Sequence, residues 1–109
     1  MSQFDERKSA EEAKYAHDSE LSFKITARRN KLLGLWAAGL MGVTGAEAEA
    51  YAKSVVVADL EEAGDGDVIR KILGDLSAAG VTRTEAQVKE ELARLLPVAR
   101  EEIARDSKG

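Results

Sequence analysis

The side chains that most often carry catalysis are scarce in this chain of 109 residues. It contains one histidine, His17, and no cysteine. A Cys/His pair and a zinc site built from Cys and His ligands therefore cannot form. A Ser-His-Asp triad would have to use His17, which lies in a segment with few apolar side chains to hold catalytic geometry. We therefore predict that the protein is not an enzyme.

An acidic stretch that contains glycine, DLEEAGDGD, runs from Asp59 to Asp67. A calcium-binding loop needs acids at alternate positions and a glutamate at position twelve. Position twelve is Arg70 when the loop is counted from Asp59, and Leu76 when it is counted from Asp65. The pattern fails, so we expect a solvated helix end, an N-cap for the next helix and no metal site.

A short basic cluster could bind phosphate groups, because Arg and Lys suit phosphate oxygens. Its members are Lys24, Arg28, Arg29 and Lys31. No phosphate-binding loop accompanies them, since the nearby glycines follow no strand and are not followed by a Gly-Lys-Ser/Thr sequence. We predict at most a weak ATP or ADP site here and no other cofactor. A solvated basic helix face is the alternative.

The charge balance argues against nucleic acid as a partner. The formal net charge is -4, whereas nucleic-acid-binding domains usually carry a basic stripe. The longest nearly uncharged apolar run, from Leu32 to Val43, is shorter than the roughly 20 residues that a membrane-spanning helix needs. The N-terminus also lacks the apolar segment of a secretory signal. We expect a cytoplasmic protein without direct membrane insertion.

Frequent Ala, Leu, Glu and Lys, with a single proline, favour helix over strand. We predict an all-α fold, a four-helix bundle with helices at about 20–41, 45–63, 67–79 and 83–106. The residues expected to end the first three helices are Gly42, Gly64 and Gly80. Capping boxes are expected at Thr44–Glu47 and Thr82–Glu85, where they would open the second and fourth helices.

Apolar side chains recur at helical spacing and define the expected core. They are Leu21, Ile25, Leu32, Trp36 and Leu40 in the first helix, Ile69, Ile72, Leu73 and Leu76 in the third, and Val88, Leu92, Leu95, Leu96, Ala99 and Ile103 in the fourth. This periodicity assigns Trp36 to the core rather than to a binding site. The run Val55–Val57 is assigned to a buried helical face, with a strand as the alternative.

Glycine and proline, which disfavour helix, occur inside two of the predicted helices. Gly34 and Gly39 lie inside the first helix, where each costs about 1 kcal/mol of helix propensity, and we expect them to allow close helix approach. Pro97 lies inside the fourth helix, and we expect a kink there. An early end of the helix at Pro97 is the alternative.

Residues 1–19 differ from the rest, because they have helical propensity but little apolar surface to dock on a core. We expect a mobile arm here and a bundle from residue 20 to 109. Phe4, Lys8, Glu11 and Tyr15 follow a 4-3-4 spacing, which would place both aromatic rings on one face of an induced helix. His17 has an unperturbed pKa of about 6.5 and could act as a pH switch, with a merely solvated histidine as the alternative.

Three strings carry a resemblance to a known family. They are KYAHD at residues 14–18, ARRNKLLGLWAA at 27–38 and TGAEAEAYA at 44–52. The chain resembles the zeta subunit of the alphaproteobacterial ATP synthase, a family also described as ATPase inhibitor subunits. The resemblance covers the whole chain and is weaker after about Lys53.

The resemblance implies a four-helix bundle with an N-terminal inhibitory arm that enters an interface between catalytic subunits and blocks ATP hydrolysis. The implied partner is the catalytic head of the F-type ATP synthase, which would place a monomeric protein at the periphery of the inner membrane. By position, the candidate contacts are Phe4, Lys8, Glu11, Tyr15, His17 and Asp18. Two other functions stay open: a nucleotide-responsive helical adaptor and a general helical protein-interaction module.

Overall fold

Four α-helices make up the fold, which confirms the predicted all-α class. The computed structural model describes the backbone of residues 2–59 and 64–108, and the side chains of residues 20–59 and 64–106. The helices are α1 (Ser2–Leu40), α2 (Gly45–Asp59), α3 (Gly66–Ala78) and α4 (Glu85–Lys108), and no strand occurs within these described ranges. Helix α1 contacts the other three, so it forms the axis of the bundle.

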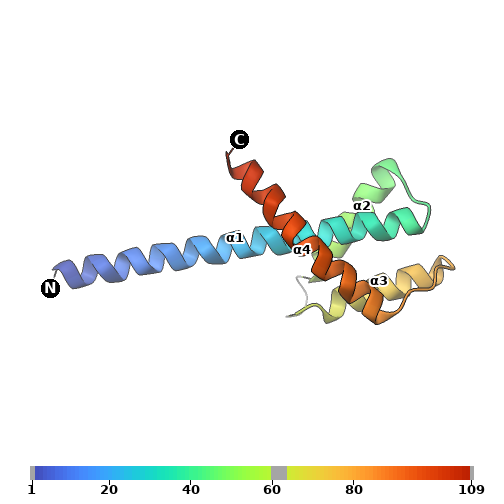
Figure 1. The fold of residues 1–109 in the computed structure, drawn as a ribbon, viewed down its shortest axis with the longest axis horizontal. Coiled ribbons are helices and arrows are strands. Elements are labelled where there is room, and N and C mark those ends of the chain that lie inside the picture. The colour runs from blue at the N-terminus through green and yellow to red at the C-terminus, as the bar shows by residue number, and fades with distance from the viewer. Residues whose placement is uncertain (1, 60–63, 109) are drawn as a thin grey trace.

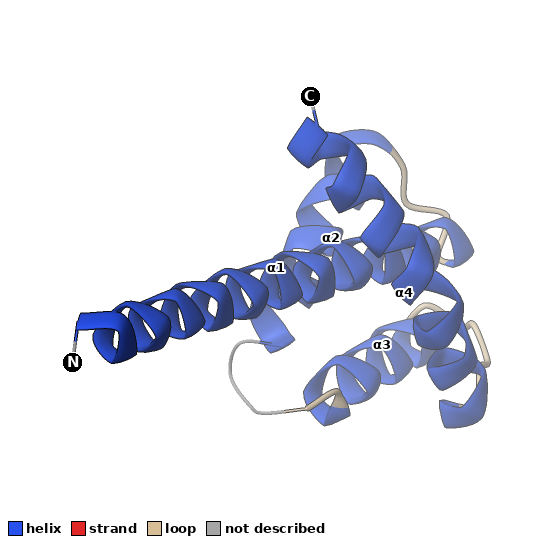
Figure 2. Ribbon diagram, turned by 60° about the vertical axis from the view of Figure 1, so that its left-hand side comes forward, coloured by secondary structure: helices blue, strands red, loops and turns tan. Residues whose placement is uncertain are grey.

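The C-terminal half of α1 lies among the other helices, while its N-terminal half extends well beyond them (Figure 1). The molecule is accordingly elongated, with extents of 64 × 29 × 21 Å. Helix α2 returns beside α1 after a short turn, and α4 crosses α1 obliquely (Figures 1 and 2). Helix α3 contacts all three other helices, α2 the most.

The helix boundaries agree with the predicted ones for α3 and α4 to within two residues. The predicted last residues of the second helix, 60–63, lie outside the described residues. Helix α4 continues through Pro97, as predicted. Helix α1 begins at Ser2 rather than near residue 20, since the Ala, Glu and Lys residues of this segment favour helix. The mobility of residues 1–19 stays a prediction.

Two of the predicted helix ends rest on glycine in the left-handed region. Gly42 and Gly80 both have φ of 78°, a conformation that side chains with a Cβ rarely adopt. The amides of Val43 and Val81, which follow them, donate to the carbonyl oxygens of Ala38 and Leu76 at 2.9 and 2.8 Å. This is the Schellman pattern, which satisfies the free carbonyl groups at the ends of α1 and α3.

The two predicted capping boxes are not formed where expected. At the start of α4 the N-cap is Thr84 rather than Thr82: the Gln87 amide donates to Thr84 Oγ1 at 3.1 Å, and the Thr84 amide donates to Gln87 Oε1 at 2.8 Å. The same sequence pattern therefore fits two residues later than predicted. In the described part of the chain the Thr44 side chain makes no hydrogen bond, and α2 begins directly after it at Gly45, whose φ is 62°.

The core lies where α3 and α4 pack against α1 and α2. Its fully buried apolar side chains include Leu33, Val55, Val68, Ile72, Leu76 and Val88. The predicted stripe of α4 is confirmed for Val88, Leu92, Leu95, Ala99 and Ile103, which are all buried, while Leu96 is half-buried. The valine run is helical, as predicted, but only Val55 is buried and Val57 is 53% exposed.

The buried face of α1 is not the one predicted. Its buried apolar side chains are Leu33, Ala37 and Ala38, and the predicted Leu32, Trp36 and Leu40 pack half-buried at the edge of the core. The reason is that α1 is contacted from two sides, by α2 and by α4. A helix between two neighbours buries a broad face, and the closest approach falls on its small residues.

Gly34 allows α1 and α2 to approach closely, as predicted. A Cβ added there would lie 2.6 Å from the Cα of Ala52 and 3.2 Å from Val55 Cγ2. The same prediction is wrong for Gly39, because a Cβ there would have nothing within 4 Å. Gly39 lies in the last turn of α1 on an exposed face, so no neighbour requires a small residue.

Candidate functional site

The predicted contact residues of the arm lie outside the described side chains. They are Phe4, Lys8, Glu11, Tyr15, His17 and Asp18. The backbone that carries them belongs to the N-terminal half of α1, and their contacts stay a prediction. The described side chains begin at Glu20, so the part of the site with known geometry is the segment where the arm joins the bundle.

This joining segment, residues 20–28 of α1, is here termed the root of the arm. None of its described side chains is buried, and Phe23 is 57% exposed. Glu20 and Lys24 form an ion pair of 3.7 Å within the same helix. Such an exposed pair contributes only about 0.3–0.5 kcal/mol, and because both residues belong to α1 it does not connect the root to another helix.

The predicted basic cluster does not converge on one point. Lys24 pairs with Glu20, and Lys31 lies 3.7 Å from Glu49 of α2. The two arginines between them also bind carboxylates, but on α4 and at the start of α3. A phosphate group would have to compete with these acids, and nucleotide binding by this cluster stays a prediction.

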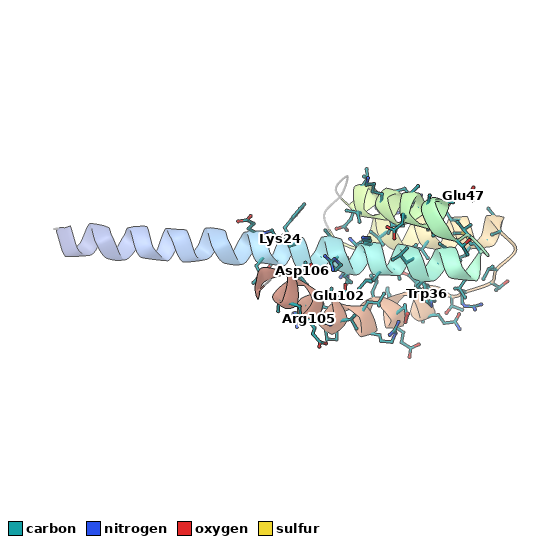
Figure 3. The ribbon with its side chains drawn as sticks, turned by 90° about the horizontal axis from the view of Figure 1, so that it is seen from above. Lys24, Trp36, Glu47, Glu102, Arg105 and Asp106 are labelled. Atoms are coloured by element: carbon teal, nitrogen blue, oxygen red, sulfur yellow. The ribbon has the colours of Figure 1, made fainter. Side chains whose placement is uncertain are left out.

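Arg28 joins the root to the last turns of α4, where Figure 3 labels its two partners, Glu102 and Asp106. Its Nη1 donates to Glu102 Oε1 and its Nη2 to Asp106 Oδ2, each at 2.8 Å. The Arg28 and Glu102 side chains are 28% exposed, so water screens this contact less than an ordinary surface pair. The two hydrogen bonds, first that of Glu102, raise the pKa of Arg28 and keep it charged. A planar guanidinium bound by two carboxylates fixes direction as well as distance.

Arg29 points into the bundle and connects α1 to the start of α3. Its side chain is 10% exposed, and its Nη2 donates to Asp65 Oδ1 at 2.7 Å. Nε and Nη2 also donate to Asn30 Oδ1 at 3.2 and 3.0 Å. Asp65, in the acidic stretch predicted to supply an N-cap, is the N-cap residue of α3, but its side chain makes no capping hydrogen bond and binds Arg29 instead. A buried cation of this kind needs such partners to offset its desolvation.

Asp59, the last described residue of α2, belongs to the same polar group. Burial raises its pKa, while Arg29 and Asn30 act in the opposite direction and Asp65 adds to the rise. Asn30 is fully buried, and its Nδ2 lies close enough to act on Asp59 but completes no hydrogen bond of normal geometry with any described atom. Arg29 thus acts on two carboxylates, Asp59 at the end of α2 and Asp65 at the start of α3. Burial favours the neutral form of Asp59.

A cleft of about 510 Å³ opens beside Arg29, between α1, α3 and α4. Its walls are apolar, from Ile69, Leu92 and Leu96 among others, and the Glu85–Lys89 pair lies at its edge. Its charges are balanced, because Arg29 binds Asp65 and Lys89 lies 3.3 Å from Glu85. The cleft therefore offers shape and apolar surface rather than an excess of either charge.

Sequence reasoning missed Asn30, Glu102 and Asp106. A signal for Asn30 was present, because it shares a helix face with Leu33 and Ala37 and is therefore a polar residue in an apolar stripe. No sequence signal pairs Arg28 with acids 74 and 78 residues away.

Among residues 20–59 and 64–106, no group of three or more His, Cys, Asp or Glu side chains is arranged to hold a metal ion. In the same described ranges, none of the helices has the length and apolarity to cross a membrane.

Comparison with known proteins places this geometry in context. A family model described as ATPase inhibitor subunit zeta matches residues 1–102. A solved structure, a solution NMR structure of a protein, is 49% identical with a TM-score of 0.71, and the match covers 79% of this chain and 98% of the other. The comparison with curated proteins gave no match.

Proposed function

Because the chain belongs to the ATPase inhibitor subunit zeta family, we propose that its N-terminal arm inhibits an F-type ATP synthase by entering a catalytic interface. The partner is the catalytic head, and the blocked reaction is ATP hydrolysis. The arm comprises residues 1–19, and the bundle anchors it. The protein acts as a free monomer in the cytoplasm that binds the membrane-associated enzyme at its periphery, and it performs no catalysis of its own.

The observation that carries this proposal is the length of α1. At about 1.5 Å per residue, a helix of 39 residues is about 58 Å long, roughly twice the width of the bundle. Its N-terminal half lies beyond the other helices, where it is available to a partner (Figure 1). A helix that leaves a compact bundle in this way supports insertion into a deep interface, which a flat bundle surface does not reach.

The composition of the arm supports the same role. Phe4 and Tyr15 share one face in the 4-3-4 spacing and would supply the apolar contacts that dominate binding energy. Lys8 and Glu11 on that face would select charges on the partner. His17 and Asp18 follow directly, so protonation of His17 near neutral pH would alter the charge that the arm presents.

Removal of residues 1–18 tests the proposal. We expect the truncated protein to keep its helical circular dichroism spectrum and to change in stability by less than about 1 kcal/mol, since the described core begins in the C-terminal half of α1. Inhibition of the cognate ATPase should be lost. A truncated protein that folds and still inhibits would locate the inhibitory surface on the bundle and refute the proposal.

A matched variant keeps the full chain. Phe4→Ala with Tyr15→Ala removes both aromatic rings from the arm and leaves the bundle sequence intact. The expected result is weaker inhibition with an unchanged thermal midpoint. Leu32→Ala serves as the contrasting control, because it should lower the thermal midpoint through the core and affect inhibition only in that way.

A further inference from the structure

The side chains of the root are exposed or half-buried, with Leu21 and Ile25 among the half-buried ones, and Arg28 adds a polar contact to α4. From residue 20 to residue 28 no described side chain is buried, whereas Arg29, Asn30 and Leu33 beyond it are. Arg28 binds Glu102 and Asp106 of α4. Among the described polar contacts that link α1 to another helix, this one lies nearest to the arm. Half-buried apolar side chains tolerate small rotations, so this directional contact is what sets the angle of the root against α4.

A small change of direction at Arg28 becomes large at the end of the arm. When the arm is helical, as in α1, the roughly 26 residues between Ser2 and Arg28 span about 39 Å at about 1.5 Å per residue, so a tilt of about 10° moves the helix start by about 7 Å. A misplacement of that size exceeds the tolerance of a specific interface, where side chains must fit pockets on the partner.

We propose that Arg28 is a positioning residue for inhibition: with Glu102 and Asp106 it fixes the direction in which the arm leaves the bundle. This inference rests on the proposed function, because it assumes that the arm inhibits. The fork of Arg28 binds acids one turn apart on α4, at 2.8 Å each, so rotation of the root about its own axis or away from α4 breaks at least one bond. The last turns of α4 thereby act on the arm without belonging to it.

An ordered root also lowers the entropic cost of binding. Residues that are already helical and correctly directed need not be ordered again when the arm enters its interface. Loss of the contact should therefore weaken inhibition through affinity, while the fully bound complex remains inhibited to the same extent.

The test compares Arg28→Gln with Arg94→Gln in the full chain. Arg94 forms a similar pair with Glu91 at 2.5 and 2.7 Å, but both residues belong to α4 and the Arg94 side chain is 62% exposed. For Arg28→Gln we expect the inhibitor concentration for half-inhibition to rise about three- to tenfold, and amide hydrogen exchange in residues 20–27 to accelerate by a similar factor, as the loss of a charged hydrogen-bonded contact implies. Arg94→Gln should change neither.

A charge reversal separates positioning from direct contact with the ATPase. Arg28→Glu combined with Glu102→Arg and Asp106→Lys restores the attraction with opposite polarity, so it should recover at least half of the lost affinity. Normal inhibition by Arg28→Gln, or weak inhibition without recovery in the reversed variant, would overturn the inference. If the wild-type protein itself does not inhibit, the proposed function fails, and unchanged exchange in the root of Arg28→Gln would then overturn the inference separately.

Discussion

Replacement of Gly34 by alanine should destabilise the protein, although alanine is the better helix former. In an isolated helix this substitution gains about 1 kcal/mol, because glycine loses more backbone entropy on folding. Here the new Cβ would lie 2.6 Å from the Cα of Ala52, 3.1 Å from its Cβ and 3.2 Å from Val55 Cγ2. The nearest atom belongs to the backbone, so no change of side-chain rotamer relieves the overlap.

The cost follows from the distance that must be regained. A normal carbon–carbon contact is about 3.5–4.0 Å, so α1 and α2 would have to separate locally by about 1 Å. That separation also loosens Leu33, Ala37 and Val55, which are fully buried along the same contact. Overpacking of this kind costs about 1–3 kcal/mol. We expect a cost of about 2–3 kcal/mol, because the added Cβ meets a backbone atom, which can move only if the helix moves. After the propensity gain, the net loss should be about 1–2 kcal/mol.

Gly39→Ala is the matched control, since it makes the same chemical change five residues later in α1 with nothing within 4 Å. It should be neutral or stabilise by up to about 1 kcal/mol. Urea unfolding followed by circular dichroism gives both values, and a loss of 1 kcal/mol corresponds to roughly 4–8 °C in thermal midpoint for a domain of this size. If Gly34→Ala is as stable as Gly39→Ala, the tight packing of α1 on α2 is not real and the reasoning fails.

Two further predictions concern the core and the polar group beside it. Leu92 is 5% exposed, so Leu92→Ala should lower the free energy of unfolding in urea by about 2–5 kcal/mol. Leu96 is half-buried, so Leu96→Ala should cost clearly less. Equal costs for the two variants would contradict the assigned buried face of α4. The pKa of Asp59 is raised by burial, so its contribution to stability is largest at acidic pH and is lost as pH rises through its folded-state pKa. Asp59→Asn should therefore lose less stability than the wild type when the pH rises from about 4 to 7, as measured by urea unfolding at both pH values. If the variant and the wild type lose the same free energy of unfolding, the pKa of Asp59 is not raised in the folded state.

The features that the sequence determined alone are the local ones. Helix type follows from propensity and apolar spacing, which act within a few residues of one another. The ends of α1 and α3 follow from Gly42 and Gly80, because a backbone with φ of 78° selects glycine whatever surrounds it. The buried face of α4 could also be predicted from the sequence, because that helix has a narrow row of apolar residues with charged residues around it.

Tertiary packing decided the features for which the sequence offered equivalent choices. Thr82 and Thr84 both begin a capping-box pattern, and the helix starts after Thr84. The apolar residues of α1 allow more than one buried face, and contact with two neighbouring helices selected the one centred on Leu33 and Ala37. Gly34 and Gly39 look alike in sequence, but only Gly34 faces another backbone.

The same distinction explains the basic cluster. The residues Lys24, Arg28, Arg29 and Lys31 are close in sequence, and from sequence alone they could form one phosphate site or one solvated face. Successive helical positions differ by about 100° in direction, so Arg28 and Arg29 point to different neighbours. Arg28 meets acids of α4, and Arg29 meets an acid at the start of α3. Which acids face each arginine depends on how helices distant in sequence pack together, and only the tertiary structure decides that.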